Sequence, residues 1–512
     1  MTDLRIGIDV GGTNTDAVLL GPDNALLARC KTPTTADPLD GIAAALAAVA
    51  PDDRSAVGMA ALGTTHALNA ILRRRELGRV AVLRLAAPAT LSVPPFADWP
   101  DDLRAAIDGG GGIVAGGVEI DGRTHAIDHD ELQRVLAACG SIDAVAISGV
   151  FSMQDPSQEL EAAEVVRAEL GDGVGISLGH LVGGVGLLER ENAAILNAAL
   201  GGVARRVIDG FEQALAACGL SATPFLTQND GTLMSIDQAR ELPVLTIGGG
   251  ASNSIRGAGV LTGLTDALVI DVGGTSTDVG AISGGFPRES AFGVELGGVQ
   301  TNFRMPDVVS VALGGGTIIH PDGALGPESV GYRITEQARI FGGDVQTLSD
   351  LAVADGRASM GDPTLAGGAR PDVLAAADAL VADAVDRMKL VAGDTPLIAV
   401  GGGSAVLSDR IPGCAEVVRP ANYDVANAIG AAVGLVSGDA EHVLDLGADR
   451  AAGIESVRQD AAERARRAGA DPAGLEVIRV DEVPLAYTDP PMSRVRVKVA
   501  GPPRAATAGE QR

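Results

Sequence analysis

The residues best suited to chemistry in this chain occur in two short stretches that lie far apart and repeat one pattern. They read Asp9-Val-Gly-Gly-Thr-Asn-Thr-Asp16 and Asp271-Val-Gly-Gly-Thr-Ser-Thr-Asp278, and they differ only at Asn14 and Ser276. Each stretch lies between two apolar runs, which predicts a β-hairpin with Gly-Gly at its turn. Glycines let a backbone approach a phosphate closely, and turn N–H groups and Thr hydroxyls can hold its oxygens. The repeat therefore predicts two phosphate-binding hairpins.

Each hairpin also carries two aspartates, which would repel a bare phosphate unless a cation lay between them. The motif therefore predicts a Mg²⁺-nucleotide rather than a free anion. Asp9 and Asp271 are the candidates for holding Mg²⁺ through waters and for catalysis, and Asp278, like Asp16, could do the same or orient a nucleophile. For one copy alone, an aspartate that caps the hairpin turn is an equally good explanation, and the repetition favours the site. The candidates for holding the nucleotide are Gly11, Gly12, Thr13, Asn14, Gly273, Gly274, Thr275 and Ser276.

Two such hairpins in a chain of 512 residues predict a two-lobed α/β molecule with the nucleotide in a cleft between the lobes. Residues 1–185 alternate predicted strands and helices and form the first lobe. Residues 186–440 begin with a long helical stretch that would bridge the lobes, and continue into the second lobe. Residues 441–512 predict a small C-terminal α+β domain, a charged helix followed by two strands, and a disordered tail of about a dozen residues.

Composition argues against several classes of function. The net charge of −27 argues against nucleic-acid binding and against an anionic membrane surface, and a solvated acidic surface is its simplest explanation. No apolar run is long enough to cross a bilayer, and no signal peptide is expected. The four cysteines lie far apart without CxxC spacing, which favours reduced thiols in a cytoplasmic protein over disulfides, zinc or an iron–sulfur cluster.

Further glycine-rich segments follow the second hairpin. The segment from Gly401 to Ser404 comes directly after the apolar run Leu397 to Val400. Glycines at the carboxyl end of a strand are where a doubly wound sheet binds ligands, and a tight turn between strand and helix is the alternative. The segment Gly314 to Gly316 has the same ambiguity and a weaker claim. The candidates for ligand binding here are Gly401, Gly402, Gly403, Ser404 and Asn427, the last in a small-residue helix suited to close packing between lobes.

Together these segments resemble the actin, sugar-kinase and Hsp70-like ATPase superfamily, whose fold is ribonuclease H-like. The resemblance implies that the hairpins are its two phosphate segments, that Gly401 to Ser404 and Asn427 form the adenosine pocket, and that ATP is the nucleotide. More narrowly, the chain resembles the hydantoinase/oxoprolinase family, in particular its hydantoinase A (N-methylhydantoinase A-like) type, over about residues 4 to 435. The matching stretches are Gly63-Thr-Thr-His-Ala-Leu-Asn69, Glu189-Arg-Glu-Asn-Ala-Ala-Ile-Leu-Asn-Ala198, Asn229-Asp-Gly-Thr-Leu-Met-Ser235 and Gly326-Pro-Glu-Ser329.

The family resemblance implies that the chain is one component of an ATP-dependent hydrolase. Such a component phosphorylates the carbonyl oxygen of a cyclic amide (hydantoin, 5-oxoproline or a thiohydantoin-like ring) and so activates the ring for opening. Longer members carry Ser-Gly-Pro-Ala where this chain has Gly248-Gly-Gly-Ala-Ser-Asn-Ser254, and they have a long C-terminal extension. Thr301-Asn-Phe-Arg-Met-Pro-Asp307 and Phe341-Gly-Gly resemble the shorter branch instead. That branch accompanies a separate partner of the hydantoinase B or thiohydantoin-processing type, so a hetero-oligomer is expected.

On the substrate side, His66 is the best candidate for a general acid or base among the six histidines, because it lies inside a family-matching segment. A hydrogen-bonded structural histidine is the alternative. Thr64, Thr65 and Asn69 lie around it at a predicted helix start, where N–H groups can face an oxyanion. Further candidates are Glu191 and Asn192 at a helix start, Asn229 and Asp230 before a turn glycine, and Arg304 as a phosphate ligand, each with a purely structural alternative.

The hairpins alone do not name the acceptor of the phosphoryl group. A sugar or small-carboxylate kinase of the same fold is therefore one alternative. An ATP-switched binding protein is another, although the sequence shows no separate peptide-binding domain. Stimulation of ATP hydrolysis by a cyclic amide, by a sugar or by neither separates the three hypotheses.

Overall fold

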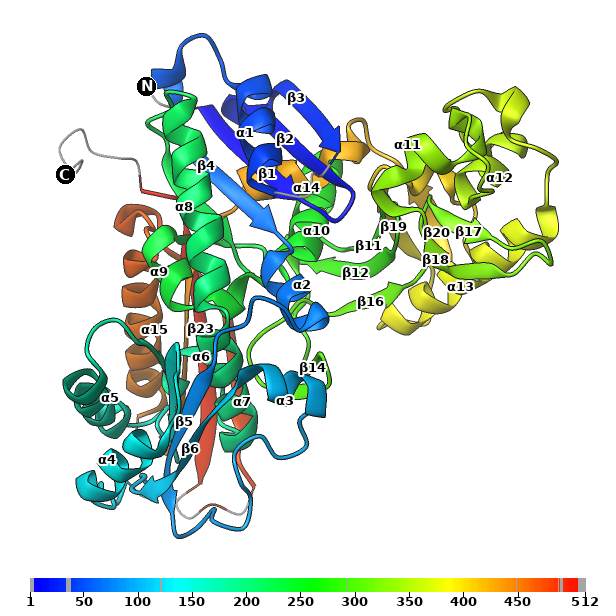
Figure 1. Ribbon diagram of the computed structural model, residues 1–512. Coiled ribbons are helices and arrows are strands. Elements are labelled where there is room, and N and C mark those ends of the chain that lie inside the picture. The colour runs from blue at the N-terminus through cyan, green and yellow to red at the C-terminus, as the bar shows by residue number, and fades with distance from the viewer. Residues whose placement is uncertain are drawn as a thin grey trace.

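The computed structural model describes residues 4–33, 38–119, 122–291, 293–447, 449–486, 488 and 491–504. The first hairpin lies inside a nine-stranded sheet (Figure 1), where β1 pairs antiparallel with β2 and parallel with β4. Side chains such as Ile6 and Ile8 are fully buried in it. In spatial order the strands are β22 (Glu476–Pro484), β23 (Met492–Gly501), β21 (Val436–Asp445), β10 (Leu233–Ser235), β9 (Thr223–Thr227), β4 (Val57–Thr64), β1 (Leu4–Val10), β2 (Asn14–Leu20) and β3 (Leu26–Pro33).

The C-terminal elements extend this sheet instead of forming a sheet of their own. β22 and β23 are the predicted strand pair, and β23 also pairs along its whole length with β21. The charged helix α15 (Arg450–Arg467) packs on β21 and β23. An isolated hairpin is marginally stable, so joining an existing sheet stabilises it. Residues 505–512 of the predicted tail lie outside the described residues.

The strands therefore do not follow the predicted division at residue 185. β9 and β10 come after that boundary, yet they lie in the sheet of the first hairpin. The predicted helical stretch forms α7 (Leu187–Ala199) and α8 (Gly201–Ala217), which meet at Leu200. α8 packs on α1 (Pro38–Val49), and α7 packs on strand β7 (Ala144–Gly149) of another sheet. These two consecutive helices thus connect the body built on the nine-stranded sheet with the body built on the sheet that contains β7.

That other sheet has four parallel strands and lies at the lower left of Figure 1. Its order is β6 (Asp108–Ala115), β5 (Val80–Ala87), β7 and β8 (Gly175–Leu178). Parallel strands need crossover connections, and helices supply them and cover both faces. The helices of this region are α2 (His66–Arg73), α3 (Asp101–Ile107), α4 (His129–Ala138), α5 (Ser157–Leu170), α6 (Gly179–Val182) and α7, with α9 (Ile236–Glu241) beside α8.

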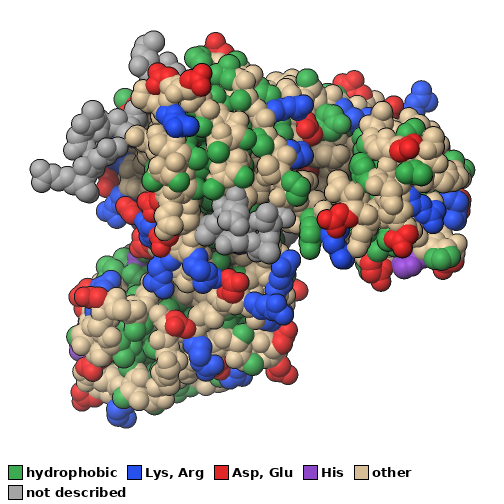
Figure 2. Space-filling view, turned by 45° about the horizontal axis from the view of Figure 1, so that its top comes forward, with side chains coloured by type: hydrophobic (Ala, Val, Ile, Leu, Met, Phe, Trp, Pro, Cys, Tyr) green, Lys and Arg blue, Asp and Glu red, His purple; other side chains and the backbone are tan. Residues whose placement is uncertain are grey.

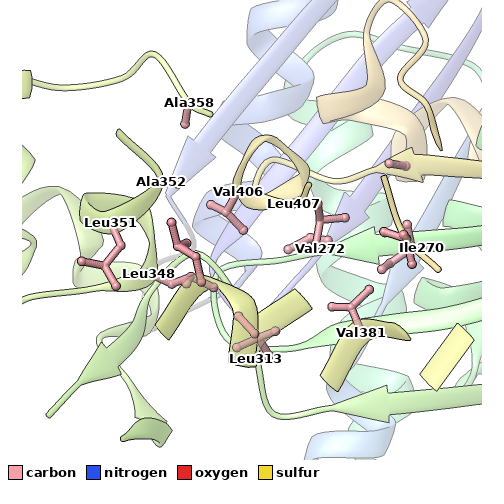
Figure 3. Packing of buried hydrophobic residues seen from close by; sticks show 14 of the residues in the cluster. Ile270, Val272, Leu313, Leu348, Leu351, Ala352, Ala358, Val381, Val406 and Leu407 are labelled. Carbon is pink, nitrogen blue, oxygen red and sulfur yellow. The ribbon is translucent and has the colours of Figure 1, made fainter. Parts of the chain in front are cut away.

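The second hairpin supplies strands β11 and β12 to the sheet of the second lobe, which lies at the right of Figure 1. Figure 3 shows Ile270 and Val272 of this hairpin among the buried side chains that form its core, including Leu313, Val381 and Val406. The strands are β13 (Phe286–Pro287), β12 (Thr277–Ser283), β11 (Ala267–Val272), β19 (Thr395–Val400) and β20 (Cys414–Val418), with β16 (Val308–Val311) paired to β12. One small ribbon, β17 (Thr317–Ile319) with β18 (Leu325–Ser329), and helices α11 (Ile334–Gln337), α12 (Leu348–Ala354) and α13 (Pro371–Met388) complete the lobe. The ribbon β14 (Val294–Leu296) with β15 (Val299–Thr301) instead packs on α7, in the body of the four-stranded sheet.

Two helices lie between the two hairpin sheets. α14 (Ala426–Ala432) packs on β1 and β2, while α10 (Gly249–Thr262) packs on β11 and β12, and the helices pack on each other. Glycines make this packing close. A Cβ at Gly430 would overlap the carbonyl oxygen of Asn253, and a Cβ at Gly257 would overlap that of Ala426. The contact between the lobes is therefore backbone against backbone.

The face shown in Figure 2 carries acidic and basic side chains interspersed over both the lower and the right-hand bodies. Within the described residues, no helix is long and apolar enough to cross a membrane. All four cysteines are unpaired and partly buried.

Gly430→Ala tests the packing of α10 on α14. The added methyl group has no space beside the Asn253 carbonyl, so we expect a loss of stability of about 1–3 kcal/mol or more, which is typical of overpacking. Gly202→Ala is the matched control, because it also lies in a helix and a Cβ there meets only the tip of Arg206. Chemical denaturation of both variants measures the effect, and equal stability of the two would contradict the packing.

Candidate functional site

The two hairpins have the same geometry. In the first, Asp9 pairs with Asp16 across the strands, and in the second Asp271 pairs with Asp278. The turns match as well. The Gly11 N–H donates to the Asn14 carbonyl at 3.0 Å, and the Gly273 N–H donates to the Ser276 carbonyl at 2.9 Å. The predicted strand–turn–strand units are confirmed.

The turns of the two hairpins meet. A Cβ placed on Gly274 would lie 3.1 Å from the Thr13 hydroxyl oxygen, although the two residues come from different lobes. A Cβ on Gly12 would meet nothing within 4 Å, so the first turn has open space beside it. Two glycine turns with their Thr side chains therefore meet where the two lobes join. That they hold one nucleotide between them remains a prediction.

Asp9 and Asp271 share one hydrogen-bond donor. The Asn427 amide nitrogen at the start of α14 lies 3.4 Å from Asp9 Oδ2 and 3.3 Å from Asp271 Oδ2. The carboxylates of the two lobes are thus held side by side. The expected place of Asn427 beside adenosine remains a prediction, and its observed contacts are with the two carboxylates.

α10 supplies one further donor to each carboxylate, which sequence reasoning missed. Asn253 Nδ2 donates to Asp9 Oδ1 at 3.0 Å, and the Ser254 hydroxyl donates to Asp271 Oδ2. Gly63 on β4 makes room for the first contact, since a Cβ there would overlap the Asn253 amide. The signal that could have found these donors is the Ser-Asn-Ser at residues 252–254, where longer relatives differ.

The four hairpin carboxyls lie in an environment that disfavours their charged form. Burial raises the pKa of Asp9 to about 7, and the nearby Asp16 and Asp271 add to the rise. Burial likewise raises the pKa of Asp271, against hydrogen bonds from Ser254 and Asn427. It raises the pKa of Asp16 to about 6 and that of Asp278 to about 6. A positive charge among these four side chains would favour the charged form of all of them at once.

The outer aspartates differ in their partners. Lys31 on β3 forms an ion pair with Asp16, with its Nζ 2.6 Å from Oδ1 and 2.7 Å from Oδ2. Asp278 instead accepts from the Ser310 hydroxyl at 2.5 Å. The two hairpins are therefore alike in backbone but differ in the charge beside their outer carboxylates.

Two glycine triplets support the second hairpin. Gly401 has a φ of +83°, and a Cβ there would overlap Asp271 Oδ1, so only glycine fits. The Gly403 N–H donates to the Val272 carbonyl at 2.8 Å, while Gly402 faces open space. Gly315 and Gly316 donate to the hairpin carbonyls of Gly273 and Gly274, at 3.0 and 2.7 Å. The segment Gly314 to Gly316 thus braces the turn.

His66 lies near the turn end of the first hairpin. It begins α2 directly after β4, whose Gly63 and Thr64 pair with Asp9 and Val10. Its Nδ1 lies 2.5 Å from the Thr64 hydroxyl oxygen. Its place is compatible with the predicted acid–base role, which stays a prediction.

Other substrate-side candidates have structural roles. Glu191 is buried and forms a bidentate ion pair with Arg84, with both distances at 2.6 Å. Asn192 accepts from the Trp99 indole and donates to the Gln300 carbonyl. The side chain of Asn229 bonds the backbone at residues 244, 248 and 304, Asp230 pairs with Lys498, and Arg304 pairs with Glu441. These contacts are the ones expected if each of these residues has a purely structural role.

The donor set fits a loosely held divalent cation. Mg²⁺ usually keeps several waters and binds one or two carboxylates together with phosphate oxygens. Asp9 and Asp271 form such a pair, one from each lobe. In the part of the chain that the structure describes, no three or more His, Cys, Asp or Glu side chains are grouped so as to enclose a metal ion. The geometry therefore fits a cation held through waters and not a closed protein cage.

Comparison with known proteins identifies the family. Residues 5–170 match the hydantoinase/oxoprolinase N-terminal region, and residues 190–369 match the hydantoinase/oxoprolinase region that follows it. The chain belongs to the hydantoinase/oxoprolinase family. The resemblance drawn from the residues is confirmed.

Two curated relatives are similar over most of the chain. The caprolactamase alpha subunit of Pseudomonas jessenii is 29% identical over 421 residues, which cover 73% of this chain and 58% of that protein. The acetophenone carboxylase gamma subunit of Aromatoleum aromaticum is 27% identical over 400 residues, which cover 69% and 53%. The chain thus spans a little over half the length of these relatives.

Solved structures share the fold. The ATP-dependent caprolactamase from Pseudomonas jessenii has a TM-score of 0.76 at 19% identity, covering 99% of this chain and 89% of that one. Nucleotide-free acetone carboxylase has a TM-score of 0.69 at 16% identity, covering 100% and 89%. The predicted α/β fold class is confirmed.

Asp9→Asn tests the electrostatics of the hairpins without nucleotide or metal. The folded-state pKa of about 7 lies above the ordinary 3.8, so the stability contributed by the wild-type carboxyl is fully present below about pH 4 and is lost as the pH rises through about 7. We therefore expect Asp9→Asn to raise the Tm relative to wild type by several degrees at pH 8 and by much less at pH 4.5. Asp237→Asn, whose side chain is 97% exposed, is the control. A difference in Tm between Asp9→Asn and wild type that does not change with pH would contradict the raised pKa of Asp9.

Proposed function

We propose that this chain is the ATP-using subunit of a hydrolase that phosphorylates and so activates a cyclic amide, of the hydantoin, 5-oxoproline or thiohydantoin type, for ring opening. The observation that carries the proposal is the pair of glycine hairpins that bring Asp9 and Asp271 together in a chain of this family. The named activity of the caprolactamase relative supports it.

The chemistry suits such a site. An amide resists water because its nitrogen donates electrons into the carbonyl. In the proposed step the carbonyl oxygen attacks the γ-phosphorus of ATP, the bond to the β-phosphate oxygen breaks, and ADP leaves. Water then adds to the carbonyl carbon and the ring C–N bond breaks, which leaves an acyl phosphate. A second water attacks the same carbon, and phosphate leaves with the former carbonyl oxygen. Phosphoryl transfer needs mainly positioning and charge neutralisation.

The residues present can meet those needs. The turn N–H groups around Gly12 and Gly274 and the hydroxyls of Thr13 and Thr275 would hold phosphate oxygens. Asp9 and Asp271 would hold Mg²⁺, which supplies positive charge when bound. Gly401 to Ser404 would receive the adenosine, since Gly402 there faces open space. Asp278 is the proposed group for orienting the nucleophile, and His66 is the proposed group for moving a proton.

We further propose that the chain works with a partner subunit of the hydantoinase B or thiohydantoin-processing type. The relatives' names describe them as subunits, alpha in one case and gamma in the other. A partner would supply the group that adds water to the activated carbon.

ATP hydrolysis by the purified chain with Mg²⁺ tests the proposal. We expect ADP release to rise at least tenfold with hydantoin, 5-oxoproline or a thiohydantoin, alone or with the co-expressed partner, and not with sugars. Asp271→Asn should lower the stimulated rate by about 100-fold or more, because it removes one of the two carboxylates that would hold Mg²⁺ at the phosphates. Asp383→Asn, exposed on α13 of the same lobe, is the control and should keep the full rate. Stimulation by a sugar alone would make the chain a kinase, and nucleotide binding without any stimulation would favour a switch.

A further inference from the structure

Lys31 completes a row of three side chains across the sheet of the first hairpin. Asp9 on β1 is paired with Asp16 on β2, and Asp16 is paired with Lys31 on β3. Residues opposite each other in antiparallel strands project from the same face of a sheet. Asp9 and Asp16 are buried, whereas the Lys31 side chain, on the edge strand, is 31% exposed. The row therefore leads from the buried carboxylates towards solvent, and a cation stands at its outer end.

The corresponding row of the second lobe contains no cation. There Asp278 is paired with Asp271 on one side and with Ser310 of β16 on the other, so Ser310 occupies the position that Lys31 has in the first lobe. Its hydroxyl donates to Asp278 but carries no charge. The backbone of the site is thus repeated while its charge is not.

Positive charge is scarce around the hairpins. Among the described residues, Lys31 is the one basic side chain that contacts any of the four hairpin carboxyls, whose other partners are Asn253, Ser254, Asn427 and Ser310. When ionised, those carboxyls carry four negative charges, of which one Mg²⁺ and Lys31 together would balance three. The phosphates of a nucleotide add further negative charge, so a cation here is needed beyond the ion pair with Asp16.

The ammonium of Lys31 has a donor to spare. It carries three N–H groups, and the contacts with the two carboxyl oxygens of Asp16, at 2.6 and 2.7 Å, use two of them. Its charge also acts on the other lobe: burial raises the pKa of Asp271, and Lys31 opposes that rise. A flexible four-carbon stem lets the ammonium turn from Asp16 towards a ligand between the hairpins.

We propose that Lys31 is a catalytic residue of phosphoryl transfer, whose ammonium donates to a non-bridging oxygen of the γ-phosphoryl group of ATP. The carbonyl oxygen bonds to the γ-phosphorus as the bond to the β-phosphate oxygen breaks, and Lys31 keeps its proton and balances the charge of the group in transfer. Asp16 holds the ammonium in place beforehand. This inference rests on the proposed function for the presence of ATP, and on the row of side chains for the place.

Calorimetric binding of two Mg²⁺-nucleotides to the full chain, ADP and the non-hydrolysable ATP analogue AMPPNP, tests the contact. We expect Lys31→Met to weaken binding of AMPPNP about tenfold or more and that of ADP less than about twofold, because only AMPPNP has a γ-phosphoryl group. The kcat of ring-stimulated ATP hydrolysis should fall about 100-fold. Lys389→Met is the matched control, since this lysine of the second lobe bonds the Gly413 carbonyl, and it should bind both nucleotides like wild type.

The same substitution in an Asp16→Asn background separates a direct contact from mere support of Asp16. If Lys31 only compensates the buried charge of Asp16, Lys31→Met has no effect once residue 16 is neutral. We expect it instead to weaken AMPPNP relative to ADP about tenfold in this background too. The double variant leaves no buried carboxylate without its partner, so it keeps the test available if Lys31→Met alone does not fold.

The outcomes separate this inference from the proposed function. An equal loss of affinity for both nucleotides in Lys31→Met, an unchanged affinity for AMPPNP, no effect in the Asp16→Asn background, or no binding of either nucleotide to wild type would overturn the role of Lys31. If cyclic amides stimulate ATP hydrolysis equally in wild type and Lys31→Met, the proposed function holds and this inference fails. If the affinities change as expected but no cyclic amide stimulates hydrolysis, the role of Lys31 holds and the proposed function fails.

Discussion

The site depends on holding two like-charged carboxylates together in the interior of a two-lobed molecule. Asp9 and Asp271 repel each other, and burial makes their charge costly. Asn427 compensates by donating to both, and one residue on α10 donates to each. These donors can reach only if α10 and α14 pack with backbones touching, which Gly257 and Gly430 allow. The positions of the two carboxylates therefore depend on the close packing between the lobes.

The C-terminal strands strengthen the other junction between the lobes. Lys498 and Arg496 of β23 are almost fully buried, and both pair with Glu289 of the second lobe. Those two cations lower the pKa of Glu289, although burial alone would raise it. A buried charge that loses its partner costs several kcal/mol, so this cluster fixes how the second lobe meets the nine-stranded sheet. The hairpin turns can meet only when that placement is correct.

The sequence predicted the hairpins because a local pattern encodes them: apolar alternation, two glycines and a repeated spacing suffice. It also predicted the small-residue helix at Asn427. It did not predict that β9, β10 and the C-terminal strands share the first sheet, since partners so distant in sequence leave no local signal. For the same reason the sequence leaves Glu191 as a candidate for chemistry, whereas Arg84, far along the chain, occupies both its oxygens. Asn253 and Ser254 were missed because their targets lie in other elements.

The most direct test of the account follows the carbonyl oxygen of the substrate. Hydantoin or 5-oxoproline labelled with ¹⁸O at the ring carbonyl is turned over with ATP by the chain and its partner, and the inorganic phosphate is examined by mass spectrometry. If the carbonyl is phosphorylated, each ring opened delivers one ¹⁸O atom to phosphate. Turnover that leaves the phosphate unlabelled would contradict the account, because ATP would then not have activated the carbonyl.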